Sequence, residues 1–394
     1  MCKSSKQGMS LIEVVVVMFI LALIIGGAFT VYVSNMRIYK SETKTAETQM
    51  SKFMALELLR KDIVHAGYGL PWDLDVDDDN SSDVDYGEGK GTGDDTYYND
   101  STSPDSDGNP DSPPRPFVLK DGGGPEDSDY LVIKGALAAY NETTKKWGLL
   151  SYNGTSWVLQ NFGEGDLGDK DWVILISEQE GRELFATGYS NWYWKGNAVT
   201  TIAGLDANRI YLVYGIRREY ESGDIPRMPF NRVDYYLAKP DSLPDKCCPS
   251  TYILYRANIR HNKTPSSTLD GTRDPQPIID CVRDFQVAFG LDTNGDGSID
   301  TWNSAPPTDP DDIRSQVREV KVFILYQEGQ LLNHEATTAT IHLGDNDIYS
   351  SLGDYLSTFT PDDHGYAGQC RKENEKCYRW KVLKLAVRPM NLGD

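Results

Sequence analysis

The sequence predicts an α+β protein in which a long N-terminal helix, membrane-spanning in its first half, precedes a large antiparallel β-rich head. Three features support this prediction. Residues 14–33 contain no charged side chain. Apolar residues then recur every three or four positions to about residue 66, the spacing of an amphipathic helix. From residue 117 onward, short β-rich runs are separated by Gly, Asn and Asp turns.

Residues 1–8 form a short basic leader with Lys3 and Lys6. Residues 14–33 are long enough to cross a bilayer as one helix, since each helical residue adds 1.5 Å. A secretory signal has a small-residue cleavage site after its apolar segment, but here the small residue, Gly8, precedes that segment. Cleavage between Gly8 and Met9 would therefore leave the apolar helix on the mature protein as an anchor.

Glu13 places a carboxylate at the edge of the apolar segment. An acidic residue within a membrane costs roughly 2.5–3.5 kcal/mol on insertion scales and marks a functional position by default. Ser10 and Glu13 also have the spacing of a capping box, in which both side chains bond exposed backbone N–H groups. Capping and function do not exclude each other, and we predict a functional role for Glu13.

The helix is expected to continue beyond the membrane and to cover residues 9–66. Lys and Glu side chains alternate with its apolar stripe. Gly67, Gly69 and Pro71 then end the helix. A membrane anchor followed by an ordinary core helix would give the same pattern, so the stripe is not specific to filaments.

Residues 67–116 are predicted to form an acidic, Asp-rich surface insertion. Between Asp73 and Asp111, thirteen Asp and one Glu face a single Lys, which gives −13 of the chain's net charge of −20. So few apolar residues cannot bury a core of their own. The strong negative charge also disfavours non-specific binding of nucleic acid, so no nucleic-acid partner is expected.

Residues 117–394 are predicted to form the β-rich head. No helical repeat of the kind that a parallel sheet requires separates the strands. Asn153-Gly154 is a typical hairpin turn. The five histidines form no HExxH pattern, and no GxSxG sequence occurs. We therefore predict that the protein is not an enzyme and assign no catalytic residue.

A candidate calcium loop occupies residues 292–303. Oxygen donors alternate along it as in an EF-hand loop, with Gly297 at the sharp turn. The expected ligands are Asp292, Asn294, Asp296, Ser298 and Asp300. Position 12 is Asn303 instead of Glu, so binding should be weaker than in a cytosolic sensor. A hairpin turn is the alternative, since turns use the same residue types, but the regular alternation favours a structural Ca²⁺.

Cysteine usage predicts disulfides rather than a zinc site, because no CxxC spacing occurs. Cys2 leaves with the leader, and five cysteines remain: Cys247, Cys248, Cys281, Cys370 and Cys377. Cys370 and Cys377 can close a short ring. We expect either Cys247 or Cys248 to bond Cys281, and its neighbour to stay free or to bridge to a partner.

The N-terminal sequence Lys-Gln-Gly8-Met9-Ser-Leu-Ile-Glu13 resembles the class III signal of type IV pilins and type II secretion pseudopilins. The family usually has Phe where this chain has Met9. The helix end, from Leu58 through Asp62 to Tyr68, is similar to that of PilW-type minor pilins. Segments around 129–133, 168–176 and 279–297 follow in the order that this family uses.

The resemblance implies processing at Gly8 by a prepilin peptidase, N-methylation of Met9, and pairing of Glu13 with the Met9 amine of a neighbouring subunit. It implies anchoring in the bacterial inner membrane with the head in the periplasm, followed by assembly into a pilus at the cell surface. The expected partners are other minor pilins and the major pilin, contacted through the helix, and possible further partners include a PilY-like tip protein.

We accordingly predict a minor pilin that acts in assembly or priming of a type IV pilus near the filament tip. A GspJ-like minor pseudopilin of a type II secretion system is the nearest alternative. An exported enzyme on a pilin-like anchor is an alternative from another class. Hydrolysis of polysaccharide or peptide by the mature protein would favour the enzyme.

Overall fold

A computed structural model describes residues 11–74, 84, 86–90, 95–100, 113–139, 141–178, 181–188, 190–220, 223–261 and 271–392. The chain divides into two compact units, Met1–Met54 and Ala55–Asp394. The division falls inside the N-terminal helix, so the last turns of that helix belong to the head. The predicted α+β class, a long helix followed by an antiparallel β-rich head, is confirmed.

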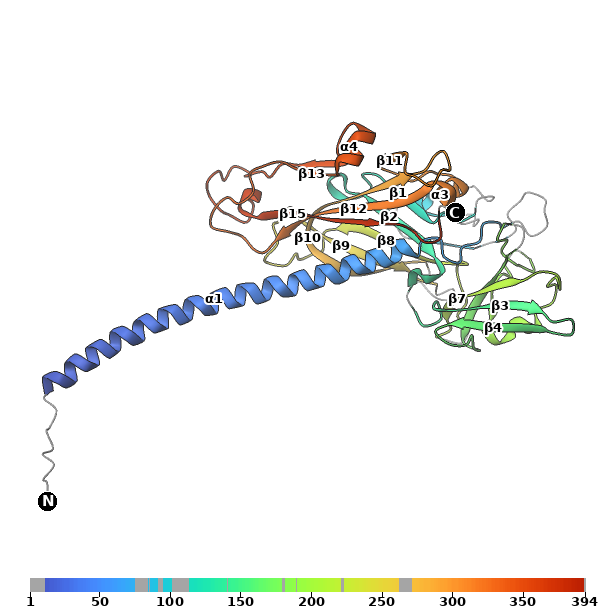
Figure 1. Cartoon of the computed structure of the whole chain (residues 1–394), viewed down its shortest axis with the longest axis horizontal. Coiled ribbons are helices and arrows are strands. Elements are labelled where there is room, and N and C mark those ends of the chain that lie inside the picture. Colours follow the sequence, from blue (N-terminus) through green and yellow to red (C-terminus); the bar gives the residue numbers. More distant parts are fainter. Residues whose placement is uncertain are drawn as a thin grey trace, which may run out of the picture. The chain divides into compact units, whose positions relative to one another are not determined.

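Helix α1 covers Leu11–Val64 (Figure 1). It ends at Val64, two residues before the predicted end, and two glycines with left-handed backbone follow, Gly67 at φ +77° and Gly69 at φ +66°. Such φ values disfavour side chains. A Cβ on Gly69 would also lie 2.9 Å from the Cβ of Ala136, so both the backbone angle and the close contact require glycine at this position.

The main sheet of the head is antiparallel and has eight strands. Seven follow one another across it in the order β1 (Phe117–Lys120), β2 (Tyr130–Gly135), β8 (Asn231–Ala238), β9 (Tyr252–Ile259), β10 (Arg273–Leu291), β12 (Val317–Glu328) and β15 (Arg379–Val387). The short β11 (Thr301–Asn303) pairs with β10. Register shifts near Pro277 and Ile279 interrupt the β9–β10 ladder, and bulges of this kind bend a strand.

The largest core joins the end of α1 to this sheet. Ala55, Leu59 and Ile63 point from the helix into a cluster with apolar residues of β2, β8, β10 and β12. Fully burying one such leucine or isoleucine side chain stabilises a fold by roughly 1.5–3 kcal/mol. The spacing of these helix residues, four positions apart, is the stripe that the sequence shows.

A second, five-stranded antiparallel sheet has its own core. Its order is β4 (Trp157–Gly163), β3 (Lys146–Tyr152), β7 (Tyr211–Arg218), β5 (Asp171–Ser177) and β6 (Trp194–Lys195). All five strands lie in the chain between β2 and β8, which are neighbours in the main sheet. The second sheet is therefore an insertion between two adjacent strands. Asn153-Gly154 lies in its β3–β4 hairpin, as the sequence predicts.

The remaining elements are short. β13 (Ile341–Leu343) and β14 (Ser357–Phe359) form a two-stranded sheet. The short α-helices are α2 (Asp95–Tyr98), α3 (Pro310–Gln316) and α4 (Asn346–Leu352). The 3₁₀ turns are Pro125–Asp127, Ala136–Ala139, Gly196–Thr201 and Glu375–Cys377.

Candidate functional site

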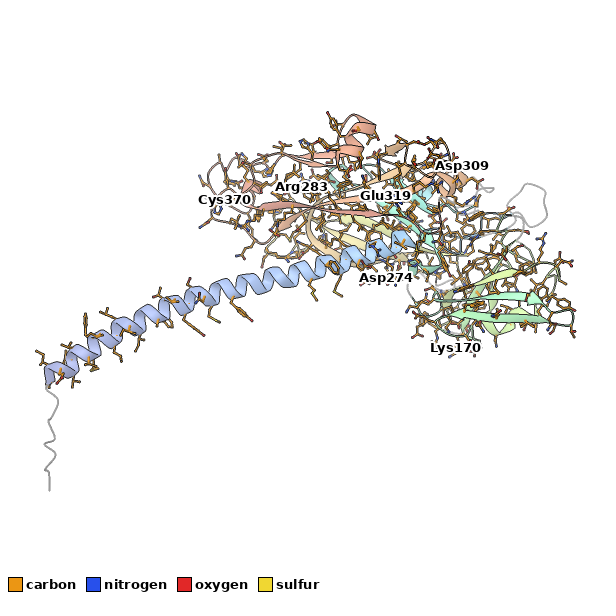
Figure 2. All side chains as sticks on the ribbon, viewed as in Figure 1. Lys170, Asp274, Arg283, Asp309, Glu319 and Cys370 are labelled. Carbon is orange, nitrogen blue, oxygen red and sulfur yellow. A yellow bond between two sulfur atoms is a disulfide. The ribbon has the colours of Figure 1, made fainter. Side chains whose placement is uncertain are left out.

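The N-terminal part of α1 has the length and composition of a membrane span. The apolar stretch Leu11–Met36 has 26 residues. No residue in its most apolar 18-residue part is buried inside the structure. Its side chains project on all sides of the helix (Figure 2). The span exceeds the predicted 14–33 at both ends. Because burying this apolar surface is favourable, it requires a membrane or other helices around it.

Glu13 lies in the first turn of α1, with its side chain exposed among apolar neighbours. An acid in the first turn of a helix interacts favourably with the helix dipole. The processing residues Gly8 and Met9, and Ser10 of the predicted capping box, lie outside the described residues. The structure therefore places Glu13 at the start of the apolar span but does not test cleavage or capping.

Asp62 fixes the other end of α1 in the head. Its carboxylate accepts hydrogen bonds from the Tyr235 hydroxyl at 2.5 Å and from Arg256 Nε at 2.7 Å. All three groups are buried. Burial raises the pKa of the Tyr235 hydroxyl well above its ordinary value, and the charge of Asp62 raises it further. A helix residue singled out by sequence thus has its ion-pair partner 194 positions away in β9.

The predicted calcium loop is closed by its own side chains. Asp292 Oδ1 accepts a hydrogen bond from the Gly295 amide at 2.7 Å, and Oδ2 accepts one from the Gly297 amide at 2.8 Å. Asn294 and Asp296 each accept a bond from the amide two positions on. Such bonds hold the chain in a tight turn. The donor set of the loop fits calcium in kind, since every predicted ligand offers oxygen.

A protein cation already occupies part of this loop. Arg318 of β12 donates to Asp292 Oδ2 from Nε at 3.0 Å and from Nη2 at 2.8 Å. Burial alone would raise the pKa of Asp292, but Arg318 and the loop amides outweigh it and hold that pKa below its ordinary value. Asp300 instead bonds the amides of Thr293 and Asn294. Among the described residues, one group of three side chains has potential metal-ligand atoms within 4.8 Å of one another, and it lies outside this loop.

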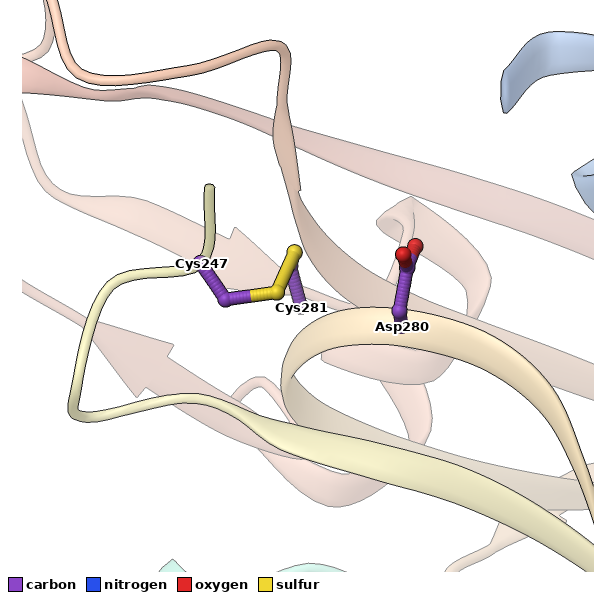
Figure 3. A group of neighbouring side chains, drawn as sticks. All are labelled: Cys247, Asp280 and Cys281. Atoms are coloured by element: carbon purple, nitrogen blue, oxygen red, sulfur yellow. A yellow bond between two sulfur atoms is a disulfide. The ribbon is translucent and has the colours of Figure 1, made fainter. Parts of the chain in front are cut away.

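That group consists of Cys247, Asp280 and Cys281 (Figure 3). The two sulfur atoms are joined in a disulfide, so they cannot bind a metal as thiolates. Asp280 pairs with Lys246, at 2.6 Å from Nζ to Oδ2. The cluster is therefore a covalent link between the loop that joins β8 to β9 and the bend of β10.

The structure contains both cysteine pairings that the sequence predicts, Cys247–Cys281 and Cys370–Cys377. Between the two neighbours in sequence, it is Cys247 that bonds Cys281, and Cys248 is free. The Cys248 side chain is fully buried, and burial raises the pKa of its thiol. A bridge from Cys248 to a partner would require the head to open locally.

The acidic segment contributes to the head interior, which the predicted surface insertion did not include. Glu88 and Asp100 are buried and share the ammonium group of Lys134 in β2, at 2.8 and 2.5 Å from Nζ. Arg232 of β8 also pairs with Glu88, at 3.2 Å. Tyr86 and Tyr98 from the same segment are buried as well. For these residues the predicted surface location is wrong, because buried cations of the sheet neutralise the acids.

Two family models match the chain. The model of type IV pilus-assembly protein W matches residues 235–378, and the prokaryotic N-terminal methylation motif matches residues 3–29. Together these two matches support a PilW-type minor pilin. No curated protein and no solved structure matches it.

The PilW match begins in β8 and ends at Tyr378, directly before β15. It therefore covers the centre of the main sheet, while the inserted five-stranded sheet lies outside both matches. The prepilin signal together with one apolar helix fits anchoring in the inner membrane followed by pilus assembly. The two family matches thus support a minor pilin of a type IV pilus.

Proposed function

We propose that this minor pilin primes assembly of the pilus and occupies a position near the filament tip. The observation that carries the proposal is a 26-residue exposed apolar span that begins beside Glu13 and leads into a bulky head. In a helical lattice each head has neighbours above and below. A terminal position leaves one side free, and this free side would accommodate the inserted five-stranded sheet.

Glu13 would act as the recognition group of the helix. After cleavage at Gly8, the Met9 amine of one subunit carries a positive charge near the start of its helix. In an apolar filament core an unpaired carboxylate is expensive, whereas a pair that is well placed offsets much of that cost. Pairing of Glu13 with a neighbour's Met9 amine would therefore set the axial position of the helix.

The proposed partners follow from this geometry. The apolar span would contact the helices of other minor pilins and of the major pilin, and a prepilin peptidase would act at Gly8 in the inner membrane. A PilY-like protein would bind the exposed side of a terminal head. A role as a structural subunit, without catalysis, is part of the same proposal.

The experiment compares Glu13→Ala with a matched surface change, Glu57→Ala, in cells that make the pilus. Glu57 lies on the same helix and is 56% exposed beside Arg60. We expect both variants to reach the inner membrane, and only Glu13→Ala to be depleted from sheared filaments. Equal incorporation of both variants would remove the proposed role of Glu13. Co-precipitation with pseudopilins of a secretion system instead of pilins would move the protein to that alternative.

Calcium binding to residues 292–300 is a separate proposal. The five oxygen donors could hold Ca²⁺, which would supply a positive charge that ties the ends of the loop together. Arg318 already supplies such a charge to Asp292. We infer that Arg318 and Ca²⁺ compete for Asp292, so that calcium should stabilise an Arg318→Gln variant more than the parent protein.

The test is thermal unfolding of both proteins in detergent micelles, with calcium or with a chelator. Magnesium serves as the control cation, because it prefers a stricter octahedral geometry. A calcium-dependent rise in melting temperature for Arg318→Gln supports the site. No calcium dependence in either protein would show that the loop is a turn.

A further inference from the structure

Trp72, just after the end of α1, lies beside two arginine side chains from distant parts of the head. The Cζ atoms of Arg182 and Arg314 are 5.2 and 5.1 Å from its ring centroid. The Trp72 amide donates to the Arg182 carbonyl at 3.0 Å, which fixes the loop of Arg182 against the ring. Arg314 lies on α3, which begins after Asp309, labelled in Figure 2.

Both arginines present N–H groups that find no acceptor in the described part of the chain. Arg182 Nε and Arg314 Nη1 are buried and have no hydrogen-bond partner there. Arg314 is 8% exposed, so water is largely excluded from its side chain and cannot accept the hydrogen bond of Nη1. A buried donor that lacks a partner costs about 1–3 kcal/mol. A ligand that accepts these bonds would recover this free energy.

Among the residues that the structure describes, Arg182 also has no carboxylate partner. Its one side-chain hydrogen bond to these residues is a long one, at 3.5 Å from Nη2 to the Tyr214 hydroxyl. Its backbone has φ +61°, a left-handed value that is rare for residues other than glycine. Strained backbone of this kind persists where surrounding structure enforces it, and it often occurs at binding sites.

The charges around Trp72 indicate which anion fits. Arg314 pairs with Asp311, and Asp309 lies close enough to influence it. Burial lowers the pKa of Arg314 to about 10; Asp309 opposes this shift and Arg182 adds to it, so the Arg314 guanidinium is charged at neutral pH. Asp311 and Asp309 therefore offset much of the charge of Arg314, whereas no carboxylate among the described residues pairs with Arg182. Arg182 supplies most of the unpaired positive charge, which is too little for a doubly charged phosphate. A planar, singly charged carboxylate matches the guanidinium fork better.

We propose that Arg182, Arg314 and the indole of Trp72 form a binding site for a carboxylate group, with Arg182 as the main cation and the ring as the apolar wall. The carboxylate could belong to a free organic acid or to an acidic side chain of a partner protein. Binding would require a rotation of the Arg182 side chain that exposes Nε. The site combines residues from inside and outside the PilW match, so it is distinct from the shared core of the family.

Trp72 offers a direct readout, because it is the only one of the eight tryptophans classed as exposed, at 38%. The experiment measures the tryptophan fluorescence of the full chain in detergent micelles. Iodide, an anion, and caesium, a cation, serve as the two quenchers. The chain carries −20, so its overall field repels iodide. If the arginines concentrate anions at Trp72, iodide should still quench part of the fluorescence. The Trp72→Phe substitution should remove this iodide-sensitive part.

Arg182→Gln should abolish this iodide-sensitive component, and acetate should compete with iodide in the parent protein. The matched control is Arg388→Gln, which removes the same charge from a side chain that is 80% exposed and paired with Glu319. Equal iodide quenching in the parent and in Arg182→Gln, with both folded by circular dichroism, would overturn the site. Failure of acetate to compete would overturn the carboxylate assignment.

Two further probes distinguish the sources of the carboxylate. One is succinate, and the other is a capped Ala-Asp-Ala peptide, with Ala-Asn-Ala as its neutral control. Competition by succinate alone identifies a free organic acid, and competition by the Asp peptide identifies an acidic protein segment. If neither probe competes more than chloride at equal ionic strength, the proposal fails.

Discussion

Two acidic regions of the head neutralise their charge in opposite ways. Glu88 and Asp100 lie in the interior and pair with Lys134 and Arg232, all nearly or fully buried. In the loop at residues 292–300, positions 293–298 and 300 are exposed, whereas Asp292 is buried. The loop carboxylates bond loop amides, and Arg318 adds an ion pair at Asp292. The first region depends on distant side chains for its neutralisation, and the second depends mostly on its own backbone.

The difference shows that acidic composition does not predict where carboxylates lie. Buried carboxylates need complete pairing, since the desolvation of each charge is large. Exposed carboxylates need only local hydrogen bonds, because water stabilises them. The two regions should therefore respond very differently to the removal of one charge, and four experiments test this contrast.

The largest effect is expected for Lys134→Met. This change leaves Glu88 and Asp100 buried without their shared ammonium group, and breaking a buried pair in this way costs about 3–5 kcal/mol. Urea unfolding of the full chain measures the loss. The control is Lys145→Met, whose ion pair with Glu164 is exposed. Similar losses for both variants would contradict the comparison.

Acid should also destabilise the buried region. Burial would raise the pKa of Asp100 and of Asp234, but Lys134 and Arg115 for the first, and Arg232 and Arg273 for the second, hold both below the ordinary value. The unfolded chain then takes up protons before the folded chain does. The contribution of Asp100 and Asp234 to the free energy of unfolding is therefore present above about pH 4 and is lost as the pH falls further.

Urea unfolding at pH 7, 5 and 3 checks this expectation. The free energy of unfolding should change little between pH 7 and 5 from these two groups and should fall between pH 5 and 3. Burial raises the pKa of Asp129, so that group acts in the opposite direction. Constant stability down to pH 3 would show that the paired carboxylates do not dominate the acid response.

A smaller loss is expected for Asp292→Asn. The amide keeps one oxygen for the loop amides but removes the charge that pairs with Arg318. The Asp292 side chain is buried, but Arg318 is 20% exposed and the next six loop residues are exposed, so water can replace part of the lost ion pair at Arg318. The urea midpoint should fall less than for Lys134→Met, and a loss as large as that variant's would mean that the loop supports the core.

The smallest effect is expected for Glu164→Gln. Its partner Lys145 is 39% exposed, and Glu164 itself is 71% exposed. Exposed pairs of this type contribute at most about 1 kcal/mol, and often nothing measurable. The melting temperature should therefore remain within error of the parent value. A clear decrease would show that exposure understates the role of surface charge in this acidic protein.

Sequence patterns predicted those features that depend on nearby residues. The helix and its end at Gly67 follow from spacing and from glycine, and the β-rich head follows from alternating runs and turns. The pairing of Cys370 with Cys377 also joins residues only seven positions apart. In each case the deciding contacts lie within a short stretch of chain.

The misses involve long-range contacts. Glu88 meets Lys134 from 46 positions away and Arg232 from 144, so the acidic residues beside Glu88 in the sequence do not indicate that it is buried. Tyr86 and Tyr98, apolar residues within an acidic run, were the available signal that this segment packs on the head. Likewise, Arg318 lies 26 positions from Asp292 and was not apparent from the loop.

Residues near the end of the chain bond back to the end of α1. The Met390 amide donates to the Val64 carbonyl at 3.0 Å, Asn391 Nδ2 donates to the Ala66 carbonyl at 3.3 Å, and Leu392 enters the main core. Tension applied along α1 would therefore reach the segment after β15 at the same point where it enters the head. The C-terminal segment is thus bonded to the head at the point where force along α1 would enter it. A pulled subunit would have to break these bonds before its sheet could unfold.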